Sequence, residues 1–264
     1  MYDHSSVLIV ALLFVSLLAA TEAGYQIGRR FVATTTDSTK TQINTIQASL
    51  LGVLALLLGF TFSLSLQRYD SRSQAVISEA NAMGTAMLRA QLLPATVRTE
   101  TQNLLREYLD LRVLAGTISL DQAEERSAVL RESGQVLDSL WRNALRAADQ
   151  DASPVTTGLF IQALNELIDA YGTRDAALNR HVPEAVLFLL FGTFILTACL
   201  VGFASGVAGH RASFPTYILV ALIVFLVFIV IDLDRPRRGL IEVSQQSLVD
   251  LQANVDVVRE SGNS

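Results

Sequence analysis

Residues 46–66 read IQASLLGVLALLLGFTFSLSL, a run of mostly apolar side chains that contains no charged residue. A helix needs about 20 mostly apolar residues to cross the roughly 30 Å of hydrocarbon in a membrane, so this run predicts a membrane span. Residues 6–28, 184–206 and 215–233 form three further windows of this kind. Because lipid offers the backbone no hydrogen-bond partner, all four spans are expected to be helices.

The composition agrees with a membrane protein and excludes several other classes. Charged residues make up 17% of the 264 residues, whereas a soluble domain has about 25%. The net charge of −5 gives no support for a nucleic-acid partner. The single cysteine, Cys199, lies in an apolar window and has no second cysteine to bridge. The three histidines are far apart and lack zinc-binding spacing: His4, His181 and His210.

Motifs of catalytic and nucleotide-binding sites are absent from the sequence. It contains no Gly-x-Ser-x-Gly, P-loop, His-Glu-x-x-His or Cys-x-x-Cys. The paired carboxylates Glu124 and Glu125 fall in a charged helical stretch, which is typical of a solvated face. We therefore expect no enzymatic activity, no cofactor and no metal ion.

The first window has to be distinguished from a cleaved signal peptide. Small residues follow its core at 19–23, as they do at a cleavage site. Residues 1–6, however, contain no Lys or Arg, and signal peptides normally carry positive charge there. We therefore expect the first window to remain as a membrane span.

Residues 67–183 are more polar and follow a helical period. No Gly or Pro occurs between Phe60 and Met83, so the second helix is expected to continue past the membrane, with Gly84 and Pro94 as the first candidate breaks. Three further helices are expected at about 96–114, at 119–148 with a capping box formed by Ser119 and Gln122, and from Ser153-Pro154, which read as N-cap and first helical residue.

The fold class that follows is an all-α membrane protein, in which four transmembrane helices carry a helical insert between the second and the third. The tail repeats apolar residues at helical spacing: Leu248, Leu251, Val255 and Val258. This stretch packs either on the insert of its own protomer or on another subunit. The predicted domains are a first transmembrane pair in 1–66, the insert in 67–183, a second pair in 184–233 and a tail in 234–264.

Flanking positive charge predicts the orientation of the spans. With the N-terminus in the cytoplasm, seven arginines lie inside: Arg68, Arg72, Arg174, Arg180, Arg235, Arg237 and Arg238. Four basic residues then lie outside: Arg29, Arg30, Lys40 and Arg211. We therefore expect the N-terminus, the insert and the C-terminus to be cytoplasmic.

The second span carries a stripe of mainly small or polar residues on one helix face. Its members recur at three- and four-residue intervals: Ser49, Gly52, Leu56, Gly59, Ser63 and Gln67. Small residues permit close packing between membrane helices, and that is one explanation of the stripe. The other is that this face lines a pore, which the flanking Phe60 and Phe62 would narrow.

Other small residues and charges mark further candidate positions. Gly24 with Gly28, and Gly202 with Gly206, have the spacing of helix contact points. Glu22 is either a functional charge in the membrane or an interfacial group that reaches water or an arginine. At the other membrane edge, a belt of mutual ion pairs is suggested by Asp232, Asp234, Arg235, Arg237 and Arg238.

The helix that leaves the second span carries Glu79 and Arg89 ten residues apart, too far to pair with each other along a straight helix. We expect each to pair with another element. The candidates are the charges at the base of the fourth span: Asp234, Arg235 and Arg237.

Six segments together form a recognisable pattern: LLGFTFS at 57–63, RYDSR at 68–72, EANA at 79–82, LRAQLLP at 88–94, REYLDLR at 106–112 and DLDRPRRG at 232–239. This combination resembles the bacterial bestrophin-like membrane family, which is catalogued as a domain of unknown function. The resemblance covers about residues 20–255. It places the chain in the bacterial cytoplasmic (inner) membrane as a multi-pass protein.

Bestrophins proper are pentameric anion channels whose second helix lines the pore. The resemblance therefore implies an oligomeric anion channel, with lipid, further copies of the chain and small anions as its partners. Bestrophins space the apolar residues of their pore neck four apart, and here only Leu56, Phe60 and Leu64 follow that spacing. Arg68 and Arg72 would attract anions to the inner mouth. The alternative is a non-conducting interaction or sensor protein that the spans anchor in the membrane.

Overall fold

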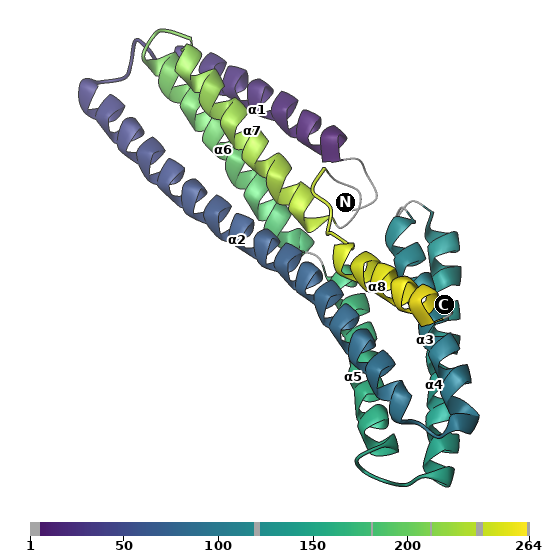
Figure 1. Cartoon of the computed structure of the whole chain (residues 1–264). Helices are drawn as coiled ribbons and strands as arrows, with labels where there is room; N and C mark the ends of the chain where they lie inside the picture. Colours follow the sequence, from purple (N-terminus) through teal and green to yellow (C-terminus); the bar gives the residue numbers. More distant parts are fainter. Residues whose placement is uncertain (1–5, 119–121, 181, 212, 236–239, 263–264) are drawn as a thin grey trace. The chain divides into compact units, whose positions relative to one another are not determined.

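The described part of the chain is built from eight α-helices and one short 3-10 helix, Ala90–Leu92, and it contains no strand (Figure 1). This computed structural model describes all residues except 1–5, 119–121, 181, 212, 236–239 and 263–264. The all-α prediction is confirmed. The helices are α1 Ser6–Arg29, α2 Asp37–Arg89, α3 Ala95–Thr117, α4 Ala123–Gln150, α5 Thr157–Asn179, α6 Glu184–Val207, α7 Phe214–Asp234 and α8 Gln246–Gly262.

These helices form two compact units. Residues 1–68 and 181–241 make up the first, which we call the membrane unit. Residues 69–180 and 242–264 make up the second, which we call the helical unit. The long helix α2 contributes its first part to the membrane unit and its last part to the helical unit.

The membrane unit contains the four predicted spans. Four stretches of the described chain are long and apolar enough to cross a membrane, and they include α1, α6, α7 and the first part of α2. The core of the unit consists of buried apolar side chains from these four helices, among them Leu17, Leu54, Phe194 and Val227. Most other side chains along the spans stay exposed, as expected for helices that face lipid.

Helices α1 and α6 run parallel and approach each other so closely that their backbones touch. A Cβ atom built at Gly24 would collide with the carbonyl oxygen of Cys199, and one at Gly202 would collide with the carbonyl oxygen of Thr21. Gly28 and Gly206 meet the facing backbone in the same way. The contact role expected from the small-residue spacing therefore holds for both glycine pairs.

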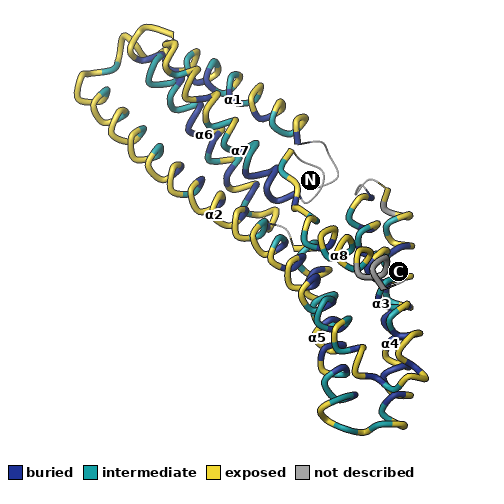
Figure 2. The backbone as a smooth tube through the Cα atoms, in the orientation of Figure 1, coloured by how far each residue is buried: buried dark blue, intermediate teal, exposed yellow. Residues whose placement is uncertain are grey.

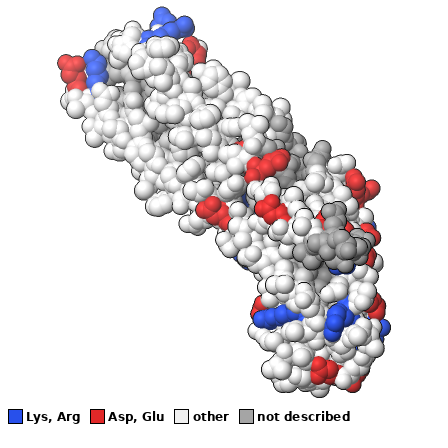
Figure 3. All heavy atoms as spheres, viewed as in Figure 1, with Lys and Arg blue, Asp and Glu red and all other residues white. Residues whose placement is uncertain are grey.

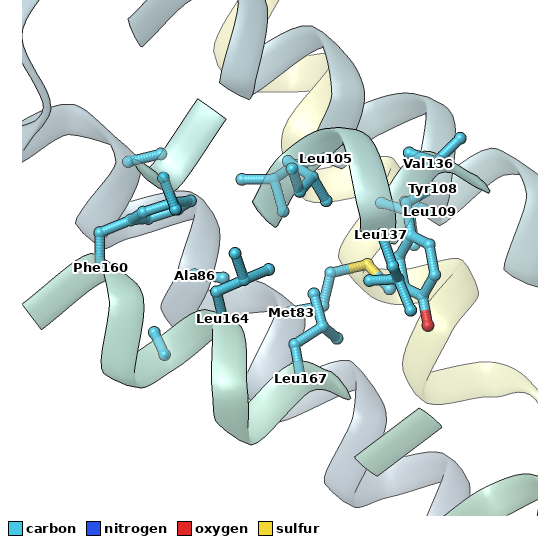
Figure 4. Close-up of a cluster of buried hydrophobic side chains, with 14 of the residues drawn as sticks. Met83, Ala86, Leu105, Tyr108, Leu109, Val136, Leu137, Phe160, Leu164 and Leu167 are labelled. Carbon is cyan, nitrogen blue, oxygen red and sulfur yellow. The ribbon is translucent and has the colours of Figure 1, made fainter. Parts of the chain in front are cut away.

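The helical unit has its own apolar core, to which α2, α3, α4, α5 and α8 contribute (Figure 4). Met83 and Ala86 of α2 lie between Tyr108 of α3 and Leu164 of α5, and all four are fully buried. This packing explains why α2 continues through Gly84, which was one of the two expected breaks. A glycine costs a helix roughly 1 kcal/mol relative to alanine, and tertiary packing of its neighbours outweighs that. The other expected break, Pro94, is the residue that precedes α3.

Two expectations about helix starts have different outcomes. The N-cap predicted at Ser153 is wrong, since α5 begins at Thr157. The Asp151 carboxylate accepts hydrogen bonds from the Ser153 amide and the Thr156 hydroxyl, which holds the preceding residues in a turn. At α4 the expected capping residue Ser119 lies outside the described residues, and Gln122 makes no side-chain capping bond.

The C-terminal stretch packs on the helical unit of its own protomer. Leu248 is fully buried in that core, and Leu251 and Val255 pack against it. The side chain of Val258 lies outside the described part. Of the two expectations for the tail, the structure favours the one within a single subunit.

The close approach of α1 and α6 generates a prediction about two glycines of the same helix. Gly202→Ala should lower the free energy of unfolding by at least about 2 kcal/mol, because its methyl group forces two backbones apart. Gly192→Ala is the matched control, because a Cβ atom there has no neighbour within 4 Å. Thermal unfolding of the purified protein in detergent measures both. Equal unfolding temperatures for the two variants would contradict the tight α1–α6 contact.

Candidate functional site

The stripe on α2 lies on the side of the helix that its own protomer leaves uncovered (Figure 2). The buried residues of this segment are Leu54, Leu58, Thr61 and Ser65. Each lies nine residues, or two and a half helical turns, from a stripe residue, and therefore on the opposite face. The residues predicted to line a pore are all exposed in the protomer: Ser49, Gly52, Leu56, Gly59, Phe60 and Ser63.

The glycines of this stripe differ from those of α1 and α6. A Cβ atom built at Gly52 or Gly59 would meet no atom within 4 Å. Close packing inside the protomer therefore does not explain the stripe, although it does explain Gly24 and Gly202. What remains is a contact with lipid, with another subunit or with a water-filled path.

Two carboxylates at one end of the membrane unit, Asp232 and Asp234, are buried and accept hydrogen bonds from backbone amides. Asp234 accepts two hydrogen bonds from the Val182 amide, at 3.2 and 3.0 Å, and its Oδ1 lies 3.9 Å from Nε of Arg68. Asp232 accepts a hydrogen bond of 2.9 Å from the Ile241 amide. These carboxylates fasten the chain before α6 and the chain after α7. The expected belt of mutual ion pairs continues into residues 236–239, which lie outside the described ranges, so it stays a prediction.

Two further arginines, one in each unit, donate hydrogen bonds to oxygen atoms of other segments of their own unit. Arg235 is buried and donates a hydrogen bond of 3.1 Å to the hydroxyl of Ser6. Arg72, in the helical unit, donates to the carbonyl oxygens of Ala177 and Arg180, at 3.2 and 2.6 Å. Because Arg72 is only 1% exposed, its guanidinium group is not presented to solvent as a mouth charge.

The helical unit encloses a cluster of buried charges around Glu79 of α2. The Glu79 carboxylate accepts hydrogen bonds from Nε and Nη2 of Arg112, at 2.6 and 3.2 Å, and from the hydroxyl of Tyr108 at 2.7 Å. Nη1 of Arg174 donates a further hydrogen bond to the same carboxylate. Arg174 also donates a hydrogen bond of 2.6 Å to the side-chain oxygen of Gln245, which precedes α8. One carboxylate thus joins α2, α3 and α5, and Arg174 adds the start of the tail.

The electrostatics of this cluster favour an ionised carboxylate. Burial by itself would raise the pKa of Glu79, but the charges and hydrogen bonds of Arg112 and Arg174 outweigh it and hold that pKa below its ordinary value. Burial and the neighbouring carboxylate raise the pKa of Tyr108 well above its ordinary value, so the phenol stays neutral as a donor. Arg112 also lies over the ring of Tyr171, 4.9 Å from its centroid.

Glu79 and Arg89 each bond to another element, as expected, but the predicted partners were wrong. Glu79 pairs with Arg112 and Arg174, neither of which was a candidate, and the candidate Arg237 lies outside the described residues. Arg89 donates a hydrogen bond of 3.0 Å to the carbonyl oxygen of Leu159 and pairs with no carboxylate among the described residues. The sequence did indicate that Glu79 is buried, because it lies at helical spacing between Val76 and Met83, on an apolar face of the helix.

The structure thus defines a multi-pass helical membrane protein with a second helical unit outside the spans. Within the described ranges it contains no group of three or more His, Cys, Asp or Glu side chains that could hold a metal ion. Comparison with known proteins agrees with this class. The sequence model of the bestrophin-like domain matches residues 15–248, so the chain belongs to the bestrophin-like family.

Solved structures of a bacterial bestrophin homolog from Klebsiella pneumoniae share the fold. One is 18% identical, covers 94% of this chain and 98% of its own, and has a TM-score of 0.60. A variant of that protein with one substitution is 16% identical to this chain and has a TM-score of 0.63. The match covers 96% of this chain and 100% of the variant. No curated protein matches the chain.

The buried cluster predicts a large effect of Glu79→Gln. Removing the carboxylate leaves two buried guanidinium groups without their counter-charge, which should destabilise the protein by about 3–5 kcal/mol. Glu100→Gln is the matched control, because the Glu100–Arg146 pair is about half exposed and such pairs contribute about 1 kcal/mol or less. Thermal unfolding in detergent at neutral pH compares the two variants. A Glu79→Gln protein as stable as the control would contradict the structural role of this cluster.

The lowered pKa of Glu79 also predicts a pH dependence. The stability that this group contributes is complete above the pKa of an unfolded glutamate, about 4.3, and is lost as the pH falls from there through the lower pKa of the folded protein. The difference in unfolding temperature between the natural protein and Glu79→Gln should therefore narrow in that acid range. A difference that stays constant from pH 7 into that range would show that Glu79 is not ionised in the folded protein.

Proposed function

We propose that this protein is an oligomeric anion channel in which the uncovered face of α2 lines the conducting path. The observation that carries the proposal is the position of the stripe. Its small and polar residues lie opposite the face that α2 buries in its own protomer. Assembly of several protomers around an axis would turn these faces toward one another.

The residues of this face are better suited to line a water-filled conducting path than to contact lipid. Ser49, Gly52, Gly59 and Ser63 leave space along the helix and add hydroxyl groups, whereas lipid tails favour large apolar side chains. Leu56 and Phe60 are the large members of the face, 58% and 60% exposed in the protomer, and would narrow the path.

Two features favour anions. Bestrophins proper conduct anions, and the chain belongs to the related family. Arg68 follows the stripe at the end of the span, its side chain is 25% exposed, and the carboxylate of Asp234 is no closer than 3.9 Å. A positive group at a pore mouth raises the local concentration of anions. The buried Arg72 would act by holding the chain after α5 in place.

A cysteine at Ser63 tests the path directly. In a Cys199→Ala background, Ser63→Cys should react with a charged, water-soluble thiol reagent, because the reaction needs water at a depth where lipid-packed helices have none. The reaction should also reduce chloride flux in vesicles reconstituted with the purified protein.

Two cysteine variants provide controls. Ser65→Cys replaces the same residue type two positions away on the buried face, and Leu189→Cys exposes a thiol on α6 near the same end of the spans. Neither should react. Absence of labelling at position 63, with chloride flux no higher than in empty vesicles and particles that are monomeric, would favour the non-conducting sensor or interaction protein instead.

The orientation of the chain belongs to the same proposal: N-terminus, helical unit and C-terminus in the cytoplasm, in a bacterial inner membrane. Val155, 71% exposed between α4 and α5, and Ser38, exposed at the start of α2, should then lie on opposite sides. In intact spheroplasts, a membrane-impermeant maleimide should label Ser38→Cys at once and Val155→Cys only after permeabilisation. The reverse pattern would invert the topology.

A further inference from the structure

A pocket of about 420 Å³ lies in the membrane unit where α1 and α6 end. It is at the opposite end of α1 from Ser6, which bonds to Arg235 after α7. Figure 3 shows charged side chains at this end of the unit and few along the spans. Six residues line the pocket: Glu22, Tyr25, Gln26, Arg29, Arg30 and Arg211.

The backbone of α1 and α6 builds this pocket. A Cβ atom at Gly206 would strike the carbonyl oxygen of Tyr25, and it would also lie 2.8 Å from the amide nitrogen of Arg29, so the end of α6 lies directly against the wall of the pocket. The chain then turns at Gly209, whose φ of 81° favours glycine, and the His210 amide donates to the Ser205 carbonyl oxygen. This turn brings Arg211 back toward α1.

The turn places Arg211 over the ring of Tyr25, with its guanidinium carbon 5.5 Å from the ring centroid. Its Nη2 lies 3.4 Å from Oε1 of Glu22, and the same oxygen accepts a hydrogen bond from Gln26. Glu22 thus reaches an arginine at the membrane edge. This agrees with the expectation that it is an interfacial group. Its partner comes from the α6–α7 connection rather than from α1.

The pocket carries excess positive charge. Its lining contains three guanidinium groups and one carboxylate, which gives a net charge of +2. Within the described residues, the side chains of Arg29 and Arg30 have no hydrogen bond and no ion pair. The negative end of the α1 dipole favours a cation at Arg29, and Glu22 balances the charge of Arg211 alone.

The position of the pocket relative to the membrane indicates which ligand it binds. The 24 residues of α1 rise about 1.5 Å each, which gives a helix of about 36 Å, slightly more than the roughly 30 Å hydrocarbon layer. The end of α1 therefore lies at the level of lipid headgroups. Guanidinium groups bind phosphate oxygens with paired, charge-assisted hydrogen bonds. We propose that this pocket binds the phosphate group of an anionic phospholipid, held chiefly by Arg29, Arg30 and Arg211. This inference does not depend on channel activity.

Lipid binding to the full-length protein in detergent tests the proposal. Native mass spectrometry would compare phosphatidylglycerol with phosphatidylcholine, which shares the phosphate but has no net charge. The protein should retain phosphatidylglycerol preferentially. Replacing Arg29, Arg30 and Arg211 together by Gln should weaken that binding about tenfold or more, as expected when at least one charge-assisted bond is lost.

Two further variants separate this effect from a loss of charge or of fold. Replacing Arg106, Arg131 and Arg142 by Gln removes the same charge from arginines that each bond to a side chain one turn away in the helical unit, and lipid binding should not change. Glu22→Gln removes the only carboxylate of the pocket and should strengthen phosphatidylglycerol binding, by about fivefold for one exposed charge pair. A misfolded protein would not gain affinity.

Either of two results would overturn the proposal. The first is phosphatidylglycerol binding that stays equal in the natural protein and the Arg29, Arg30 and Arg211 variant. The second is saturable binding of inorganic phosphate to this pocket, measured by calorimetry in the absence of added lipid, together with no preference for phosphatidylglycerol. That result would assign the site to a soluble phosphate instead of a lipid.

Discussion

One helix, α2, passes through two environments, and each part of it is arranged by what surrounds it. In the membrane unit it buries apolar side chains and two small hydroxyl groups, those of Ser65 and Thr61, and the Thr61 hydroxyl donates a hydrogen bond of 2.8 Å to the Leu57 carbonyl oxygen. In the helical unit the same helix buries a full charge at Glu79, which is tolerated only because two guanidinium groups surround it. The helices α3, α5 and the start of the tail are held to α2 through that carboxylate.

The elements of the fold could be predicted from the sequence wherever a local pattern determined them. The four spans follow from apolar runs, and the helices of the insert follow from a regular apolar spacing, to within a few residues. The start of α5 was missed because the Asp151 side chain bonds to Ser153 and Thr156, a local arrangement that competes with helix formation at Ser153.

The buried cluster could not be predicted in the same way. Arg112 lies 33 residues from Glu79 and Arg174 lies 95 residues away. No spacing rule connects positions on three helices. A carboxylate on an apolar face indicates that some partner exists, but only the packing of α3 and α5 against α2 decides which arginines reach it. Small-residue spacing was ambiguous for a related reason: it marks close backbone contact in α1 and α6, yet on α2 it marks an uncovered face.

The parallel arrangement of α1 and α6 has a consequence for how the chain is made. These two helices touch backbone to backbone, although α6 begins at Glu184 and α1 ends at Arg29. At a synthesis rate of about 5–20 residues per second, α1 waits roughly 10 to 30 s in the bilayer before its partner emerges from the ribosome. During that interval the groove at Gly24 and Gly28 faces lipid or the insertion machinery. Other glycine-grooved helices, including those of neighbouring chains, can compete for it until α6 arrives.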